Sequence, residues 1–276
     1  MSLQHRDRVV TRIPFRTVPV DDVMLAYREF GSGSPVVFIS GLGSTMDMWN
    51  PPVIERIARQ FRVIVFDNRG MGYSGGSDKP FSIPLLARDT AMLMDALGIF
   101  SAHIIGHSMG ASIAQELVLG FPAKVTRLVL VAGTCGGSES VPMQPETLAR
   151  LTDKSGTVQE VTSRMFSLLF PPSWLARHDP ARYCPAIDEI PGDEIVARQA
   201  DAFSAWTGSF SRLGKVRSPA ILVTGTDDVI VPPENSRIIR ERIFGAELVG
   251  IPGAGHGLMY QCPDRFCDSV LEFLDR

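Results

Sequence analysis

The chain has 276 residues, a formal net charge of −3 and a hydrophobic fraction of 45%. A chain of this length can bury a large apolar core, either as one α/β domain or as two small domains. Basic and acidic residues are interspersed without a basic block, which argues against nucleic acid as a partner. The N-terminus lacks the apolar segment of a secretory signal, and no later stretch has the length of a membrane span.

Four scattered cysteines, Cys135, Cys184, Cys262 and Cys267, indicate reduced thiols rather than a disulfide framework. The last two are five residues apart, which is a poor spacing for metal chelation, and no second pair accompanies them. Free cysteines in a chain of this size are commonly small buried hydrophobes. We therefore expect a cytoplasmic protein without a metal ion or another cofactor and without membrane attachment.

Short β-branched runs alternate with longer amphipathic segments, a pattern typical of a mostly parallel sheet covered by helices. Runs such as "PVVFIS" and "AILVTG" are almost entirely apolar, as expected for strands buried on both faces. In chain order, strands are predicted near residues 12–18, 23–30, 35–40, 62–67, 102–107, 126–132, 219–225 and 246–250. Helices are predicted near residues 48–60, 83–97, 109–120, 234–243 and 261–275.

Between the sixth and seventh predicted strands, the alternation stops. Residues 136–214 contain three helix-like segments and no convincing strand. The prediction is a core domain formed by residues 1–135 and 215–276, with a helical cap (lid) formed by residues 136–214. An insertion at this point lies at the carboxyl edge of the sheet, where open α/β folds bind their ligands.

The pattern G-x-S-x-G, typical of a nucleophilic serine on a sharp turn, occurs twice, around Ser74 and around Ser108. Ser74 lies in "DNRGMGYSGGSDKP", a run of glycines and turn residues in which no helix opens behind the serine, which favours a loop. Ser108 ends the apolar run "AHIIGH" and opens the helical pattern "MGASIAQELVLG". This strand, turn and helix are the context that the motif requires, so Ser108 is the candidate nucleophile.

A serine hydroxyl needs a base to become nucleophilic, and the base needs a carboxylate to orient it. Of the five histidines, His256 follows the last predicted strand in the glycine-rich "IPGAGHGLMY" and comes after Ser108 in the chain. We interpret His103 and His107 as structural and expect no catalysis from His178. The carboxylate is expected in "GTDDVIVP", where the residues alone leave Asp227 and Asp228 as alternatives.

Catalysis at a carbonyl also needs donors for the developing oxyanion. Gly41 and Gly43 flank Leu42 directly after the third strand, in a loop that can turn a backbone N–H toward the serine. The predicted oxyanion hole therefore consists of the N–H groups of Leu42 and Met109.

Five segments carry a family resemblance: "SGLG", "DNRGMGYS", "GHSMG", "GTDDVIVP" and "GHGLMYQCPDRF". Over nearly the whole chain they resemble the α/β-hydrolase fold superfamily in its serine-nucleophile branch, and they are most similar to enol-lactonase and carboxylesterase-like members. The resemblance implies an α/β-hydrolase fold, with an eight-stranded, mostly parallel sheet flanked by helices and a helical cap inserted after strand six.

The resemblance also implies roles for individual residues. Ser108, Asp228 and His256 would be nucleophile, acid and base, with Asp228 favoured because the family places its carboxylate three residues after the strand-ending glycine. Asp67 and Arg69 resemble a structural loop of the family.

We therefore expect a serine hydrolase that cleaves a small-to-medium carboxylic ester or lactone through an acyl-enzyme on Ser108. Two alternatives stay open at this stage. One is hydrolysis of a carbon–carbon bond in a β-diketone-like ring-cleavage product by the same triad. The other is a hydrolase-fold receptor for a small molecule. The sequence does not indicate an oligomeric state.

Overall fold

The computed structural model describes residues 13–185 and 192–276. It contains one eight-stranded sheet in the order β1-β2-β4-β3-β5-β6-β7-β8. The β1–β2 and β2–β4 pairs are antiparallel and the other five are parallel, which confirms the predicted fold class. The strands are β1 (Arg16–Val20), β2 (Val23–Phe30), β3 (Pro35–Ile39), β4 (Arg62–Phe66), β5 (Ala102–His107), β6 (Val125–Val131), β7 (Ala220–Gly225) and β8 (Glu247–Ile251).

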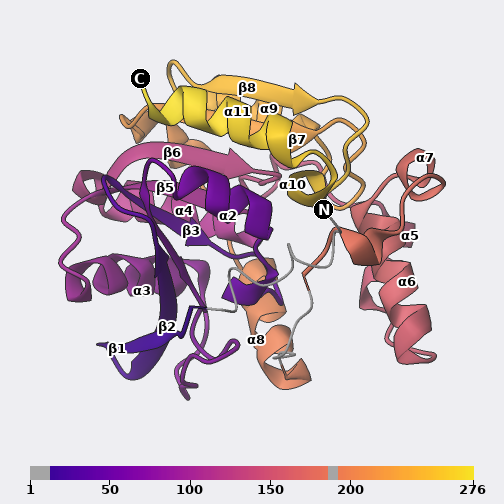
Figure 1. Ribbon diagram of the computed structural model, residues 1–276, viewed down its shortest axis with the longest axis horizontal. Helices are drawn as coiled ribbons and strands as arrows, with labels where there is room; N and C mark the ends of the chain where they lie inside the picture. Colours follow the sequence, from indigo (N-terminus) through magenta and orange to yellow (C-terminus); the bar gives the residue numbers. More distant parts are fainter. Residues whose placement is uncertain (1–12, 186–191) are drawn as a thin grey trace.

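Helices cover both faces of this sheet (Figure 1). Neighbouring residues of a strand point to opposite faces, so Ile104 of β5 belongs to one buried apolar cluster and Ile105 to the other. The first cluster includes side chains of α3 (Ile83–Ala96), α4 (Met109–Gly120) and α9 (Glu234–Arg242). The second includes side chains of α2 (Pro51–Ile57), α10 (Leu258–Gln261) and α11 (Pro263–Leu274).

Some predicted boundaries are wrong by a few residues. The first strand begins at Arg16, whereas residue 12, where it was expected to begin, lies outside the described residues. The single helix predicted near 261–275 is α10 followed by α11, because Pro263 starts a new helix in its first turn. The predicted helix near 48–60 is shorter, and a 3₁₀ turn over Met46–Met48 precedes it.

The described part of the chain between β6 and β7 contains four α-helices: α5 (Pro145–Thr152), α6 (Val158–Leu169), α7 (Pro172–Leu175) and α8 (Asp193–Ser204). Residues 186–191 of the predicted cap lie outside the described residues. Figure 1 shows the arrowheads of β6, β7 and β8 pointing toward the side on which α5, α6 and α7 lie. The same view shows α8 well apart from these three helices.

Candidate functional site

Ser108 stands on a sharp turn between β5 and α4. Its backbone has φ 56° and ψ −122°, a region that residues with a side chain rarely adopt. Its N–H donates to the carbonyl oxygen of Val131 on β6 (2.9 Å), and its own carbonyl oxygen accepts from the Ala111 N–H (2.9 Å). These bonds at the end of the strand and the start of the helix fix the strained conformation.

The two glycines of "GHSMG" allow three backbones to approach one another closely. A Cβ atom on Gly106 would lie 2.3 Å from the Gly110 carbonyl oxygen, and one on Gly110 would lie 2.0 Å from the Ile39 carbonyl oxygen. A Cβ on Gly41 would lie 3.1 Å from Cβ of Ser108. The loop after β3 therefore packs directly against the turn that carries Ser108.

The second G-x-S-x-G match has a different environment. The Ser74 hydroxyl donates to the carbonyl oxygen of Asp67 (2.7 Å) and accepts from the N–H of Ala26 (2.8 Å). No helix begins directly after it, since α3 starts only at Ile83, and the residue is 8% exposed. Ser74 thus joins β2 to the loop after β4. The Asp67 carboxylate accepts from the backbone N–H groups of Met46 (2.6 Å) and Tyr73 (3.0 Å).

His256 and Asp228 form a buried pair in the loops after β8 and β7. Nδ1 of His256 lies 2.7 Å from Oδ2 of Asp228, and the two residues are 5% and 4% exposed. Oδ1 of Asp228 accepts from the N–H groups of Ile230 and Val231, each at 2.9 Å. Because a carboxylate only accepts, the imidazole proton lies on Nδ1, and Nε2 is left as an acceptor.

Asp227, the alternative acid, is exposed and accepts from the Thr226 hydroxyl (2.9 Å). Two other histidines, His103 and His178, have different partners. His103 meets the Thr126 hydroxyl (2.9 Å), and His178 lies 2.9 Å from the Trp174 carbonyl oxygen. The structure therefore brings Asp228, and not Asp227, to His256.

His107 links the serine turn to the histidine loop. Its Nε2 lies 3.3 Å from the carbonyl oxygen of His256, and the centroids of the two rings are 4.8 Å apart. Burial, together with the neighbouring His256, lowers the pKa of His107 from 6.5 to about 3. His107 is therefore neutral at ordinary pH and donates from Nε2 to this carbonyl.

Among the described residues, no hydrogen bond joins the Ser108 hydroxyl to His256. The hydrogen bond between a nucleophile and its base is often long or poorly aligned before substrate binds, so a catalytic pair does not require this bond in the free protein. In the described loops and turns, no backbone bond uses the Leu42 N–H. Met109 is the first residue of α4, where an N–H has no carbonyl partner within the helix.

The insertion contacts both loops next to Ser108. The Leu169 carbonyl oxygen, at the end of α6, accepts from the N–H of Gly257 beside His256 (2.9 Å). Oε1 of Gln199 on α8 accepts from the N–H of Gly43 beside Leu42 (3.0 Å). Neither contact could be predicted from the sequence, because the first joins residues about 90 positions apart and the second joins residues 156 positions apart.

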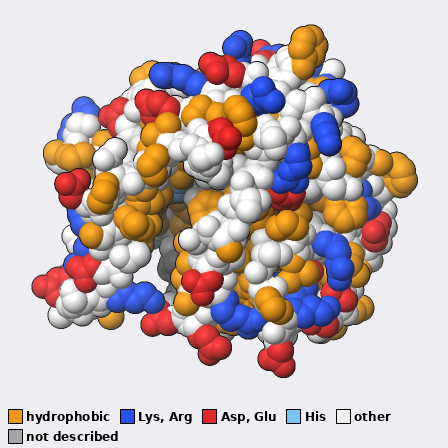
Figure 2. Space-filling view, turned by 180° about the vertical axis from the view of Figure 1, so that it is seen from behind, with side chains coloured by type: hydrophobic (Ala, Val, Ile, Leu, Met, Phe, Trp, Pro, Cys, Tyr) orange, Lys and Arg blue, Asp and Glu red, His pale blue; other side chains and the backbone are white. Residues whose placement is uncertain are grey.

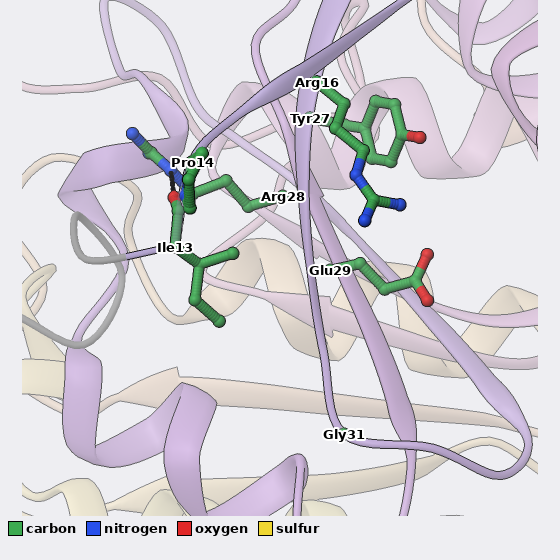
Figure 3. A pocket seen from close by; sticks show the side chains of 7 residues that line it. All are labelled: Ile13, Pro14, Arg16, Tyr27, Arg28, Glu29 and Gly31. Carbon is green, nitrogen blue, oxygen red and sulfur yellow. Dashed lines mark hydrogen bonds between the residues drawn. The ribbon is translucent and has the colours of Figure 1, made fainter.

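The molecular surface is hollowed between the lobe that contains α5, α6 and α7 and the rest of the molecule, and hydrophobic side chains line both walls (Figure 2). A separate pocket lies at the β1–β2 edge of the sheet (Figure 3). Its Arg28 donates to the Ile13 carbonyl oxygen (2.6 Å) and pairs with the buried Asp47, so this cation is already bound within the protein. None of the predicted site residues lines this pocket.

In the described ranges, no group of three or more His, Cys, Asp or Glu side chains could bind a metal ion. None of the helices described is both long and apolar enough to span a bilayer.

Residues 34–261 match the sequence profile of the α/β-hydrolase fold family. The chain belongs to this family. A provisionally named carbamate hydrolase, RutD of Azorhizobium caulinodans, is 31% identical over 91% of this chain and 95% of its own.

Two solved structures have similar folds. A thermophilic esterase from Thermogutta terrifontis has a TM-score of 0.78 and 25% identity, covering 95% of this chain and 98% of its own. The enol-lactonase of Burkholderia xenovorans LB400, with a TM-score of 0.79 and 24% identity over 95% and 100% of the two chains, shares the α/β-hydrolase fold. Family membership and the name of the relative that is 31% identical support hydrolase activity.

Proposed function

We propose that this α/β-hydrolase cleaves a small-to-medium carboxylic ester or lactone through an acyl-enzyme on Ser108. The observation that carries the proposal is the strained Ser108 turn beside a buried His256–Asp228 pair. Strain at a serine between a strand and a helix is typical of a hydrolase nucleophile, and a purely structural serine has no need of it.

In the proposed reaction, Nε2 of His256 takes the hydroxyl proton as Ser108 Oγ attacks the substrate carbonyl. The N–H groups of Leu42 and Met109 donate to the oxyanion that forms. The tetrahedral intermediate collapses, and the alcohol leaves with the proton from His256. Water, deprotonated by His256, then attacks the acyl-enzyme; the bond from the acyl carbon to Oγ breaks, His256 returns the proton to Oγ, and the carboxylic acid is released.

Within this mechanism, Asp228 holds the imidazole in the tautomer that leaves Nε2 free to accept a proton. Its Oδ1 is occupied by two backbone N–H groups, so only Oδ2 is directed to His256. His107 holds the same loop in place, because its Nε2 donates to the His256 carbonyl oxygen. We also propose that residues 136–214 act as the cap over this site.

A carbamate ester is a second candidate substrate. The relative named as a carbamate hydrolase shares 31% identity with this chain over 91% of its length. A carbamate carbonyl reacts with a serine by the same addition and elimination, so the same residues would serve. The family similarity is also compatible with a carbon–carbon bond hydrolase, which would use the same triad on a β-diketone.

The test is a panel of p-nitrophenyl esters of increasing acyl length, lactones of increasing ring size, a p-nitrophenyl carbamate and an aryl-substituted β-diketone. We expect ester or lactone turnover that Ser108→Ala lowers by about 10⁴-fold or more. Ser74→Ala is the matched control from the other G-x-S-x-G motif. Turnover of the diketone alone, or full activity in Ser108→Ala, would reject the proposal.

A further inference from the structure

The proposed oxyanion loop, residues 40–45, depends on a side chain of the insertion. Gly41 packs against Ser108, and Gly43 has φ +67°. The Gly41–Leu42 peptide carries the Leu42 N–H, and the next peptide, Leu42–Gly43, carries the Gly43 N–H. Within the loop, the Ser44 N–H donates to the Gly41 carbonyl oxygen at 3.2 Å. The Gly43 N–H instead leaves the loop and donates to Oε1 of Gln199 on α8 (3.0 Å).

Gln199 is completely buried, and its amide can have only one orientation. The Gly43 N–H is a donor, so the oxygen of the amide must face it, and Nε2 points away. Nε2 is buried and is without a hydrogen-bond partner among the described residues. An unpaired buried donor costs stability, so an apolar side chain of similar size would suit a merely structural position better.

Other residues of α8 already attach this helix to the core. A Cβ on Gly43 would lie 3.6 Å from Val196, and a Cβ on Gly70 would lie 3.1 Å from Ile195. The Arg198 guanidinium donates to the Lys79 carbonyl oxygen (2.7 Å) and lies 4.1 Å from the centroid of the Phe81 ring. The Gln199–Gly43 bond is therefore not needed to dock the helix.

We propose that Gln199 is a positioning residue, which holds the Gly43 peptide so that the adjacent Leu42 N–H points at the oxyanion formed on Ser108. The inference rests on the proposed function, because it assigns Leu42 to the oxyanion hole. The insertion then contributes to the transition state through a polar contact with the loop, in addition to any contact with substrate. A change at Gln199 should alter the chemical step more than substrate binding.

The test compares Gln199→Met with Arg198→Met, a matched change on the same helix that removes a docking contact but does not touch residues 40–45. With p-nitrophenyl acetate, we expect Gln199→Met to lower kcat by about 10- to 100-fold while KM changes by less than about threefold. Arg198→Met should keep kcat within about threefold of the parent. Gln199→Leu provides a second variant, and melting temperatures check that each protein is folded.

A second measurement is independent of turnover. A p-nitrophenyl alkylphosphonate forms a bond from its phosphorus to Ser108 Oγ and releases p-nitrophenol, while its phosphonyl oxygen occupies the oxyanion position. We expect Gln199→Met to slow this reaction by a factor similar to its loss in kcat.

Unchanged rates in folded Gln199→Met and Gln199→Leu, with an active parent, would overturn this inference alone. Equal losses in Gln199→Met and Arg198→Met would also overturn it, since general docking would then be the cause. A parent that neither hydrolyses the esters nor reacts at Ser108 with the phosphonate would overturn the proposed function and this inference together.

Discussion

The carbonyl oxygen of His256 lies 3.3 Å from Nε2 of His107, the residue directly before Ser108. Two histidines thus meet in the structure, but they are held in different ways: His256 through Nδ1 on a carboxylate, and His107 through Nε2 on a backbone carbonyl. Burial and the neighbouring His256 lower the pKa of His107 to about 3, so the imidazole that makes this contact is neutral at ordinary pH.

The stability of the protein should therefore depend on pH through His107. The unfolded chain binds a proton at His107 below about pH 6.5 and the folded protein only below about pH 3, so the unfolding free energy falls as pH decreases between these values. The slope from this group is at most about 1.4 kcal/mol per pH unit. His107→Gln can still donate to the His256 carbonyl and should lack this slope. Urea unfolding between about pH 4 and pH 8 measures it, and equal slopes in both proteins would contradict the assignment.

The acid can be identified by two neighbouring substitutions. Asp228→Asn should lower kcat by about 10⁴-fold, because an amide nitrogen facing His256 disfavours the tautomer with the proton on Nδ1. Asp227→Asn changes an exposed side chain and should alter stability by less than about 0.5 kcal/mol, with kcat close to that of the parent. Steady-state kinetics on the best ester of the panel decides between them. A larger loss in Asp227→Asn would reverse the roles.

The backbone strain at Ser108 should lower the free energy of unfolding by a measurable amount. Both Ser108→Gly and Ser108→Ala remove the hydroxyl, but only glycine adopts φ 56° without a steric cost. After allowing for the extra freedom of glycine in the unfolded chain, we expect Ser108→Gly to be more stable than Ser108→Ala by about 1 kcal/mol. Chemical denaturation of the two inactive variants gives the difference. If Ser108→Ala were the more stable of the two, the turn would not be strained.

The two G-x-S-x-G motifs should also differ in how much stability is lost when their last glycine is replaced by alanine. A Cβ on Gly110 would meet the Ile39 backbone at 2.0 Å, so Gly110→Ala should destabilise the protein by about 1–3 kcal/mol or more. Gly76, in the motif around Ser74, has no atom within 4 Å of such a Cβ. Gly76→Ala should therefore change stability by less than about 0.5 kcal/mol. Similar losses in thermal denaturation of the two variants would argue against the close approach at Gly110.

The buried ion pair of Arg69, in the loop after β4, with Asp89 leads to a prediction about stability rather than activity. Arg69 is fully buried and donates to both carboxylate oxygens of Asp89 on α3, at 2.5 and 2.6 Å. Asp89→Ala would leave a buried guanidinium without this partner and should cost about 3–5 kcal/mol. Asp22 is a second and more exposed partner at 3.3 Å, and Asp22→Ala should destabilise the protein much less than Asp89→Ala. Urea unfolding distinguishes the two, and a small effect of Asp89→Ala would contradict the pairing.

The sequence predicts the sheet well because its parallel strands are buried on both faces and consist of almost uninterrupted apolar residues. It predicts β1 less well, since this short edge strand is exposed at Arg16, Thr17 and Pro19 and no buried run marks its ends. The separation of α10 from α11 depends on Cys262 and Pro263, a local backbone effect within a continuous amphipathic pattern.

The candidate site is only partly predictable for a related reason. Ser108 and His256 are marked by short motifs, but the choice between Asp227 and Asp228 depends on the direction of one loop in space. His107 is predicted as structural, yet its bond to the His256 carbonyl follows from tertiary packing. The contact of Gln199 with Gly43 depends on how the insertion folds back, and no local pattern encodes it.

Two anchors that the insertion places on the loops beside Ser108, at Leu169 and Gln199, divide it into parts that differ in their freedom to change. Leu169 and Gln199 each hold a loop beside Ser108, whereas none of the residues of α5 is buried. Substrate range in this protein could therefore be altered by exchanging or redesigning α5 and its flanking turns while the two anchors are kept. A graft that replaced the whole segment between β6 and β7 would have to rebuild both anchors before its new pocket could support turnover.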